Sequence, residues 1–321
     1  MRTPGLLVGT FPPRRCGIAS YNAQMVSAEG WTAFDASPEA PVSRRLGAFL
    51  RAARGQEVVR VSFDPYALAC GSFQALWTYA ALLLAGAKPF EIVVHEPWMG
   101  RAYGLGLANV LYRLFCRRVT WLLHVPSQKA HLEREFGCAL RTRMLPHGGH
   151  FTRAWEGNRE TARAELGLGS GELWLCIGFV AAAKGFAPFL RGFSSLHRPE
   201  AIAMVVGCVR TPLPADLAEA QAIHAAVASG EGRLAFRDEF VDDASFDRWI
   251  VASDVVVLPY RETSTSGVVE RARLFGKVVL ARDLPGLRDV LEHDPRGVLY
   301  RDEELPEAIE RAAGLVRGGT A

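Results

Sequence analysis

The chain has few cysteines for its length, and they show no pairing pattern. Its 321 residues include six cysteines, and no two of them form a C-x-x-C pair. Cysteines spaced singly argue against a disulfide framework and against a zinc site built from cysteine pairs, and they favour a reducing compartment. We therefore expect a cytoplasmic protein.

Segments that would direct the chain elsewhere are also missing. There is no low-complexity tract and no strong internal repeat, and the apolar run at the N-terminus is too short for a signal peptide. Residues 67–87 carry no charge, but glycine and polar residues interrupt them, and Lys88 and a proline then lead into another apolar run. We interpret residues 67–87 as a helix covered by the fold, the alternative being a membrane span.

The net charge of +3 is distributed unevenly along the chain. Residues 1–150 contain 17 Lys and Arg against 9 Asp and Glu, whereas the remainder contains 20 against 25. A basic first half favours an anionic acceptor or peripheral contact with the inner face of a membrane. The alternative is a solvated helix face, and the densest basic group is Arg44, Arg45, Arg51 and Arg54. No feature points to a nucleic-acid partner.

Apolar runs of strand length alternate with helical patterns along the whole chain, which is long enough for two domains. The alternation predicts parallel sheets covered by helices on both faces, with ligands bound beyond the carboxyl ends of the strands. Pro146–Gly149 has the composition of a hinge. We therefore expect an α/β fold of two doubly wound domains facing each other across a cleft, residues 1–149 and residues 150–321. The expected strands are Gly5–Val8, Val58–Ser62, Ile92–His95, Thr120–His124, Arg143–Leu145, Leu173–Gly178, Ile202–Val206, Arg233–Phe236, Val255–Leu258, Val278–Ala281 and Val298–Tyr300.

The segment PYRETSTSGVVERARLFGK, residues 259–277, joins one of these strands to a helix. Apolar residues after Gly267 fall at helical spacing, and Gly276 suits the left-handed position that ends a helix. Thr263–Gly267 is then the turn at a helix N-terminus, where free N–H groups and the helix dipole favour an anion.

Two further glycine-containing turns follow predicted strands. One runs from Gly9 to Ser20, and the other runs from Gly178 to Phe186 and contains Lys184. Glycine lets the backbone approach a phosphate closely, and a lysine adds a full positive charge. The chain has neither a Walker P-loop nor a G-x-G-x-x-G motif. Together the three turns nevertheless predict a diphosphate held from several sides.

An ordered set of motifs resembles those of a known family. Glu262-x7-Glu270, with Leu-Pro-Tyr before it and Ala-x-x-x-Gly-Lys-x-Val after it, resembles the E-x7-E motif of retaining enzymes in glycosyltransferase family 4, which have the GT-B fold of two Rossmann-like domains. The supporting pieces occur in the expected order over about residues 7–295: the loop at Phe11–Ala19, Val94-His95-Glu-Pro-Trp, Leu145-Pro-His147-Gly, and Lys184-Gly185.

This resemblance implies transfer of a hexose, with retention, from a nucleotide-diphosphate sugar to an acceptor hydroxyl by front-face substitution, without a metal or other cofactor. The donor would bind in the second domain and the acceptor mainly in the first. By resemblance, Glu262 accepts hydrogen bonds from the sugar, Lys184 contacts the diphosphate, and the ring or backbone carbonyl of His95 contacts the sugar. The residues expected to bind the donor are Gly17, Lys184, Gly185, Thr265, Ser266, Gly267, Val268 and the ribose-binding Glu270.

Plainer roles exist for the same residues. Glu270 can simply complement the helix dipole, Glu262 can be solvated, and His95 can be a core histidine satisfied by backbone. His124 is a weaker candidate than His95, and we expect His147 to shape the hinge. We see no cluster of metal ligands in the sequence.

The sequence departs from the family pattern at Phe179, where many members have an arginine that contacts the diphosphate. Arg14, Arg15, Arg210 or Arg261 would have to replace that charge. Two alternatives stay open: a catalytically silent protein that binds nucleotide sugars, which the departure at Phe179 suggests, and a GT-B epimerase or hydrolase.

Overall fold

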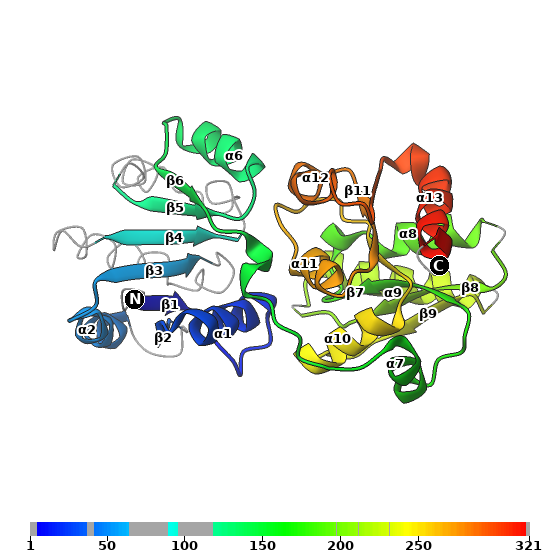
Figure 1. Cartoon of the computed structure of the whole chain (residues 1–321), viewed down its shortest axis with the longest axis horizontal. Coiled ribbons are helices and arrows are strands. Elements are labelled where there is room, and N and C mark those ends of the chain that lie inside the picture. The colour runs from blue at the N-terminus through cyan, green and yellow to red at the C-terminus, as the bar shows by residue number, and fades with distance from the viewer. Residues whose placement is uncertain are drawn as a thin grey trace. The chain divides into compact units, whose positions relative to one another are not determined.

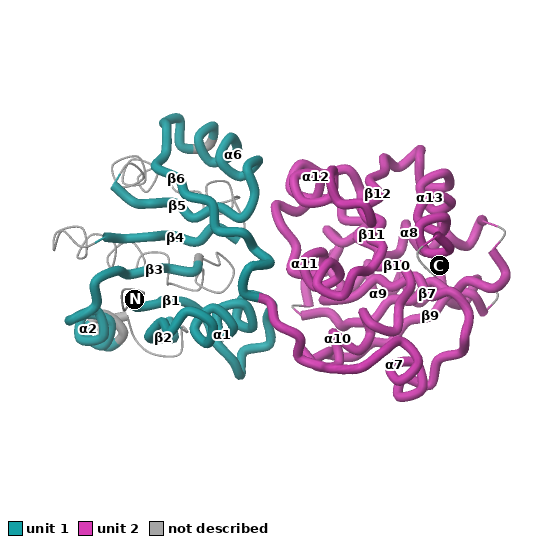
Figure 2. The backbone as a smooth tube through the Cα atoms, in the orientation of Figure 1, with its two compact units in different colours: residues 1–150 teal, residues 151–321 magenta. Residues whose placement is uncertain are grey.

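The structure is a computed structural model that describes residues 5–36, 42–63, 89–95, 118–196, 198–210, 212–230 and 232–318. It divides into two compact units, residues 1–150 and residues 151–321 (Figure 2). The uncharged stretch at 67–87 lies outside the described residues. Among the helices that are described, none has the length and apolar character needed to cross a membrane.

The first unit is built on a six-stranded parallel sheet with strand order β2-β1-β3-β4-β5-β6 (Figure 1). Its strands are β1 Gly5–Gly9, β2 Thr32–Asp35, β3 Val58–Phe63, β4 Phe90–Val94, β5 Thr120–Leu123 and β6 Thr142–Met144. Its helices include α1 Gly17–Glu29, α2 Val42–Ala53, α6 Ser127–Phe136 and the 3-10 helix η2 His147–His150. The predicted strands are confirmed. β2 was not predicted, because this edge strand is largely exposed and lacks an apolar run.

The core of the first unit lies between its sheet and the helices that cover it. Ile92 and Trp121 from adjacent strands are fully buried, and Trp121 packs against Phe136 of α6 with ring centroids 5.3 Å apart. Phe49 of α2 belongs to the same cluster. Continuous apolar runs therefore become strands in this unit, because a parallel sheet is buried on both faces.

The second unit repeats the architecture with strand order β12-β11-β10-β7-β8-β9, again all parallel. Its strands are β7 Glu172–Ile177, β8 Ala201–Val206, β9 Leu234–Arg237, β10 Val255–Leu258, β11 Val278–Arg282 and β12 Gly297–Tyr300. Its helices are α7 Arg159–Leu166, η3 Ala182–Lys184, α8 Phe186–Ser194, α9 Pro214–Ser229, α10 Asp243–Ala252, α11 Gly267–Leu274, α12 Pro285–Leu291, η4 Asp302–Glu304 and α13 Leu305–Gly318. The expected α/β class with two parallel, helix-covered sheets is confirmed.

The segment from β10 to β11 folds as its sequence predicts. All of β10 is buried, α11 begins at Gly267, and Gly276 has φ 61° just beyond the helix end. Glycine adopts this left-handed conformation and ends the helix without the steric cost that a side chain would add. The turn before Gly267 therefore lies at the carboxyl end of β10.

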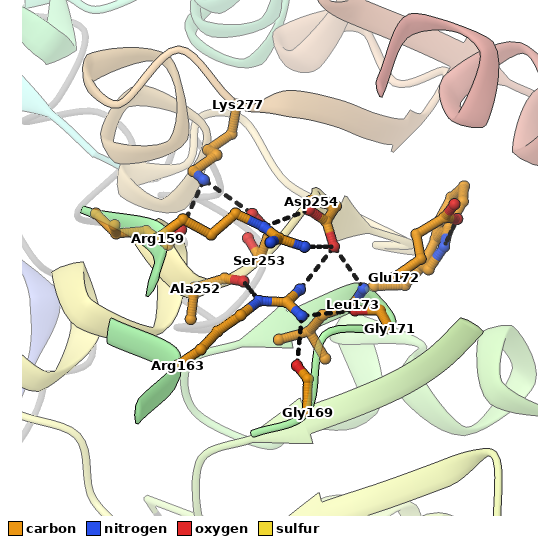
Figure 3. Close-up of polar contacts among 12 residues, drawn as sticks. Arg159, Arg163, Gly169, Gly171, Glu172, Leu173, Ala252, Ser253, Asp254 and Lys277 are labelled. Atoms are coloured by element: carbon orange, nitrogen blue, oxygen red, sulfur yellow. Dashed lines mark hydrogen bonds and ion pairs between the residues drawn. The ribbon is translucent and has the colours of Figure 1, made fainter. Parts of the chain in front are cut away.

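The opposite, amino ends of the strands are joined by a network around Asp254 (Figure 3). The Asp254 carboxylate accepts from Arg159 Nε at 2.9 Å, from Arg163 Nη2 at 2.7 Å and from the backbone N–H of Leu173 at 2.8 Å. Arg163 also donates to the carbonyls of Ala252, Gly169 and Gly171. The Nε, Nη1 and Nη2 atoms of this buried guanidinium all donate to oxygens, which fixes α7 against the entries to β7 and β10.

Lys277 completes this network from the entry to β11. Its Nζ donates to the carbonyls of Val251 at 2.7 Å and Ser253 at 2.8 Å, at the C-terminal end of α10 (Figure 3). Burial lowers the pKa of Lys277 to about 8, although the nearby Asp254 carboxylate opposes the shift. The charged form of Lys277 is thus stabilised by the carbonyl oxygens and destabilised by desolvation.

We predict that Lys277 titrates near pH 8 in the folded protein. Between pH 8 and 10.5 the unfolded chain keeps a proton that the folded protein has released, so the contribution of Lys277 to the free energy of unfolding rises with pH by at most about 3 kcal/mol. NMR of the lysine Cε resonances measures this directly, since the chain has only four lysines and Lys277→Arg assigns the signal. Four lysines that all titrate near 10.5 would contradict the prediction.

Candidate functional site

In the second unit, the turn at Lys184–Gly185 lies against the turn that follows β10. The N–H of Arg261 donates to the carbonyl of Ala183 at 2.8 Å. Gly185 has φ 62°, and a Cβ built there would lie 2.6 Å from the carbonyl oxygen of Pro259. Both the backbone conformation and the close approach therefore require glycine at this position.

Lys184 lies over an aromatic ring at this junction. Its Nζ is 3.6 Å from the ring centroid of Tyr260, which is 1 % exposed. An ammonium on the face of a tyrosine is attracted by the ring quadrupole. The Tyr260 hydroxyl is buried and has no hydrogen-bond partner within the part of the chain that the structure describes. The ring therefore holds a cation beside the carboxyl end of β10.

The start of α11 lies in the same turn. Ser266 is its N-cap and has extended backbone geometry, but among the described residues its side chain makes no capping hydrogen bond. The Thr263 hydroxyl donates to the carbonyl of Thr265 at 2.6 Å, and a Cβ on Gly286 would lie 1.8 Å from the carbonyl oxygen of Ser264. The turn is thus held by its own contacts and by α12, while the positive end of α11 is not capped by Ser266.

A buried ion pair fixes α11 in place. Arg271 is 4 % exposed and Asp247 of α10 is fully buried, and the two form a short charge-assisted hydrogen bond. Asp247 also accepts from the N–H of Ala154 at 2.6 Å, and the guanidinium of Arg271 lies 5.5 Å from the ring centroid of Phe151. The charged side chain of Arg271 is therefore buried against a carboxylate.

The two glutamates of the E-x7-E motif have different surroundings. Glu262 is exposed in the turn. Glu270 is partly buried in the first turn of α11, and its Oε2 accepts from Arg273 at 3.1 Å, while Arg273 also donates to Asp294 at 2.7 Å. Burial raises the pKa of the Glu270 carboxyl, and Arg273 opposes this shift. One oxygen of Glu270 is therefore engaged within the protein.

Phe179, where the sequence departs from the family pattern, has a cation beside it. The guanidinium carbon of Arg210 lies 5.5 Å from the ring centroid of Phe179, and the ring of Phe240 lies 6.1 Å away on centroids. The two segments run together because Val180 and Val209 form a parallel bridge beyond the ends of β7 and β8. Arg210, one of the four arginines named from the sequence as substitutes, therefore contacts Phe179.

The glycine turn after β7 is less open than its sequence suggests. The N–H of Ala182 donates to Asp216 at 2.9 Å, and the N–H of Ala187 in the first turn of α8 donates to the buried Glu219 at 2.8 Å. Both carboxylates come from α9. They accept hydrogen bonds from backbone N–H groups that an anion bound at this turn would otherwise use.

The remaining predicted residues belong to the first unit. Gly17 is exposed at the first position of α1, where a Cβ would meet no atom within 4 Å, and Cys16 caps this helix by accepting from the N–H of Ala19 at 3.2 Å. His95 directly follows β4 and is 4 % exposed. Its Nε2 lies 2.8 Å from the hydroxyl of Ser62, and its Nδ1 lies 3.3 Å from Nε2 of His124. Both ring nitrogens of His95 are therefore engaged inside the unit.

Four histidines surround the ring of Tyr21 on α1. The rings of His95, His124, His147 and His150 have centroids 5.1, 5.5, 5.0 and 5.7 Å from that of Tyr21. The first three place ligand nitrogens within 4.8 Å of one another. The cluster was not predicted from the sequence, because its members follow three different strands.

Burial lowers the pKa values of His95, His124 and His147 enough to keep these three rings neutral at pH 7. It lowers the pKa of His124 to about 4 even though the Leu145 carbonyl stabilises the ring N–H, and it lowers the pKa of His95 and His147 well below the ordinary value. The neighbouring histidines add to the shift for each of these three. Each ring thus has one nitrogen with a lone pair and one that carries a proton.

Comparison with known proteins links the second unit to a family. Residues 171–315 match the family described as "Glycosyl transferases group 1". Among curated proteins, D-inositol 3-phosphate glycosyltransferase of Nocardia farcinica is 28% identical over 181 residues. That stretch is 55% of this chain and spans only 40% of the length of the relative.

Solved structures match both units together. The structure of HepE from Anabaena in complex with UDP-glucose has a TM-score of 0.72 and 14% identity, and the match covers 97% of this chain and 91% of that one. Sucrose-phosphate synthase from Thermosynechococcus elongatus has a TM-score of 0.68 and 16% identity, covering 98% and 91% of the two chains. The chain has the GT-B fold.

In this GT-B chain, the candidate residues divide between the carboxyl edges of the two sheets. Lys184, Gly185 and the start of α11 come together in the second unit, whereas Gly17 and His95 lie in the first. The GT-B fold therefore confirms the predicted fold class. The role of each residue stays a prediction.

We predict that Gly185→Ala destabilises the protein more than Gly276→Ala does. Both glycines have nearly the same φ, 62° and 61°, so both substitutions carry a left-handed backbone cost of about 1–2 kcal/mol. Only at Gly185 would the new Cβ meet a carbonyl oxygen, because nothing lies within 4 Å at Gly276. Urea unfolding of the two variants measures the difference, which we expect to exceed about 1 kcal/mol. Equal losses would contradict the close approach.

Proposed function

We propose that this protein is a retaining glycosyltransferase that moves a hexose from a nucleotide-diphosphate sugar to an acceptor hydroxyl. The observation that supports this most strongly is the junction in the second unit, where the Lys184–Gly185 turn meets the turn between β10 and α11. That junction lies within the residues that match the glycosyltransferase family.

The diphosphate is proposed to bind at the start of α11. The side chain of Ser266 does not cap this helix within the described part of the chain, so the first N–H groups of α11 and its dipole can act on an anion. Lys184 adds a positive charge beside them. Arg210 and Arg261 are the proposed replacements for the arginine missing at Phe179, because Arg210 contacts that ring and the Cγ of Arg261 lies 3.6 Å from a Cβ built on Gly185.

The two glutamates are proposed to read the two ends of the donor. Glu262, which is exposed, accepts from the sugar hydroxyls, and Glu270 accepts from the ribose through the oxygen that Arg273 does not use. Thr265 lies in the same turn and Val268 follows it in the first turn of α11, and both are proposed to contact the nucleotide. From the first unit, Gly17 supports the diphosphate. His95 contributes its backbone carbonyl to the sugar, since both of its ring nitrogens are engaged elsewhere.

A uridine diphosphate sugar is the first donor to test. HepE from Anabaena was solved with UDP and with UDP-glucose, although at 14–15% identity to this chain. A ligand that binds only the folded protein must raise its stability, by about 2.7 kcal/mol at a hundred times the dissociation constant. We expect UDP to raise the melting temperature more than GDP or ADP.

The transfer step is proposed to occur on one face of the sugar. The bond from the anomeric carbon to the leaving phosphate oxygen breaks while the acceptor oxygen forms its bond on the same face, and the departing diphosphate takes the acceptor proton. This route needs no protein nucleophile and no metal in the transfer step. Positioning and stabilisation of the developing negative charge carry the catalysis.

We predict that the product keeps the anomeric configuration of the donor. Proton NMR of the product, recorded early in the reaction with an α-linked donor, should show a new α-glycoside. A β-glycoside would overturn the assignment of retention but leave glycosyl transfer intact.

We predict that Lys184→Met lowers kcat by ~100-fold or more, because it removes a cation from the leaving group in the transition state. The matched control is Lys129→Met, since Lys129 is an exposed lysine of the first unit that pairs only weakly, at 3.9 Å, with Glu133. Arg210→Gln should lower kcat further in the Lys184→Met background if Arg210 supplies the missing charge. Unchanged turnover in Lys184→Met would contradict the proposed phosphate site.

The presence of Phe179 favours one alternative function, the binding of nucleotide sugars without catalysis. In that case the donor would stabilise the protein, and no acceptor would yield product.

The acceptor is proposed to bind to the first unit, whose basic composition favours an anionic or membrane-associated molecule. A cytoplasmic location with peripheral membrane contact is part of the same proposal.

A further inference from the structure

The carboxyl ends of three adjacent strands in the first unit each carry a buried histidine. His95 follows β4, His124 follows β5 and His147 begins η2 after β6. Their exposed fractions are 4, 5 and 8 %. One nitrogen of each ring lies within 4.8 Å of the others. Neighbouring parallel strands end at one edge of the sheet, which brings together three side chains that are far apart in the sequence.

We propose that His95 Nδ1, His124 Nε2 and one ring nitrogen of His147 bind a single divalent transition-metal ion, with Zn²⁺ as the ion to test first. Neutral imidazole suits zinc, copper, iron and nickel, and three histidines with one open position are an established kind of zinc site. The site belongs to the first unit alone and does not depend on the proposed glycosyl transfer.

The spacing of the rings fits one ion between them. With metal–nitrogen bonds of about 2.05 Å, two ligand nitrogens on a tetrahedral ion are about 3.3 Å apart. The distance between His95 Nδ1 and His124 Nε2 is 3.3 Å. The same geometry puts the ring centroids about 5.2 Å apart. The observed distance is 5.0 Å for His95 and His124, whereas the ring of His147 lies 4.4 Å from that of His124 and 6.1 Å from that of His95, so this ring would have to shift to complete the set.

The other nitrogens of two rings already have the partners that metal-binding histidines use. His124 Nδ1 donates to the carbonyl of Leu145 at 2.8 Å, which leaves Nε2 with the lone pair. His95 Nε2 lies 2.8 Å from the hydroxyl of Ser62 and can donate to it, which leaves Nδ1 for the metal. Such outer contacts fix the tautomer and the ring orientation of a ligand.

The surroundings limit access of water to these rings. Tyr21 packs against the His95 and His124 rings edge to face, at interplanar angles of 83° and 77°. Beyond it, His150 Nδ1 lies 3.3 Å from the carboxylate of Glu29. With three protein nitrogens bound, a tetrahedral ion keeps one position for water. The competing explanation is a packed histidine cluster held only by the contact between His95 and His124.

Metal titration of the purified full-length chain separates these two explanations. After removal of metal with a chelator, we expect one Zn²⁺ per chain by calorimetry, and Co²⁺ in its place should give the visible absorption of a tetrahedral site. His124→Asn and His147→Asn should each weaken Zn²⁺ binding by about 100-fold or more, since loss of a mere outer contact costs 10–100-fold. His293→Asn is the matched control, because His293 is exposed in the second unit.

Nitrogen-15 NMR of the unmodified protein covers the case in which a variant fails to fold. Zn²⁺ should shift the signals of His95 Nδ1 and His124 Nε2 and leave His124 Nδ1 protonated. No saturable binding, binding that both folded variants retain, or shifts confined to exposed histidines would overturn the proposal.

Discussion

Both candidate sites depend on the parallel direction of the strands. Each strand in either sheet pairs with its neighbours in parallel, so all the carboxyl ends of a sheet meet at one edge. Side chains and turns that leave this edge are gathered in space even when they are distant in sequence. In the second unit the edge gathers the turns after β7 and β10, and in the first unit it gathers the histidines after β4, β5 and β6.

In the second unit, contacts among the turns decide which groups are available to a ligand. Gly185 fits against the carbonyl of Pro259 only because it lacks a side chain, and this contact places Lys184 over the Tyr260 ring. The start of α8 is occupied by Glu219, whereas Ser266 leaves the start of α11 uncapped in the described residues. The end proposed to bind the anion is therefore the start of α11, and the buried pair of Arg271 and Asp247 holds this helix in place.

In the first unit, the same edge produces a cluster of neutral rings rather than a charged pocket. His95, His124 and His147 are each too buried to remain protonated, and their nitrogens converge. The resemblance directed attention to His95 as a residue at the donor sugar. The structure shows that the ring of His95 contacts Ser62 and His124, so the proposed sugar contact from this position is made by the backbone carbonyl.

Local sequence determined most of the secondary structure. Continuous apolar runs such as Val255–Leu258 became buried strands, and Gly267 and Gly276 bounded α11, because these features depend only on neighbouring residues. Tertiary structure alone decided the long-range pairs: Arg210 beside Phe179 and the histidines around Tyr21. The exposed strand β2 also required its neighbour, since it has no apolar pattern of its own. Propensity acts along the chain, whereas these contacts form only after the sheets bring distant segments to one edge.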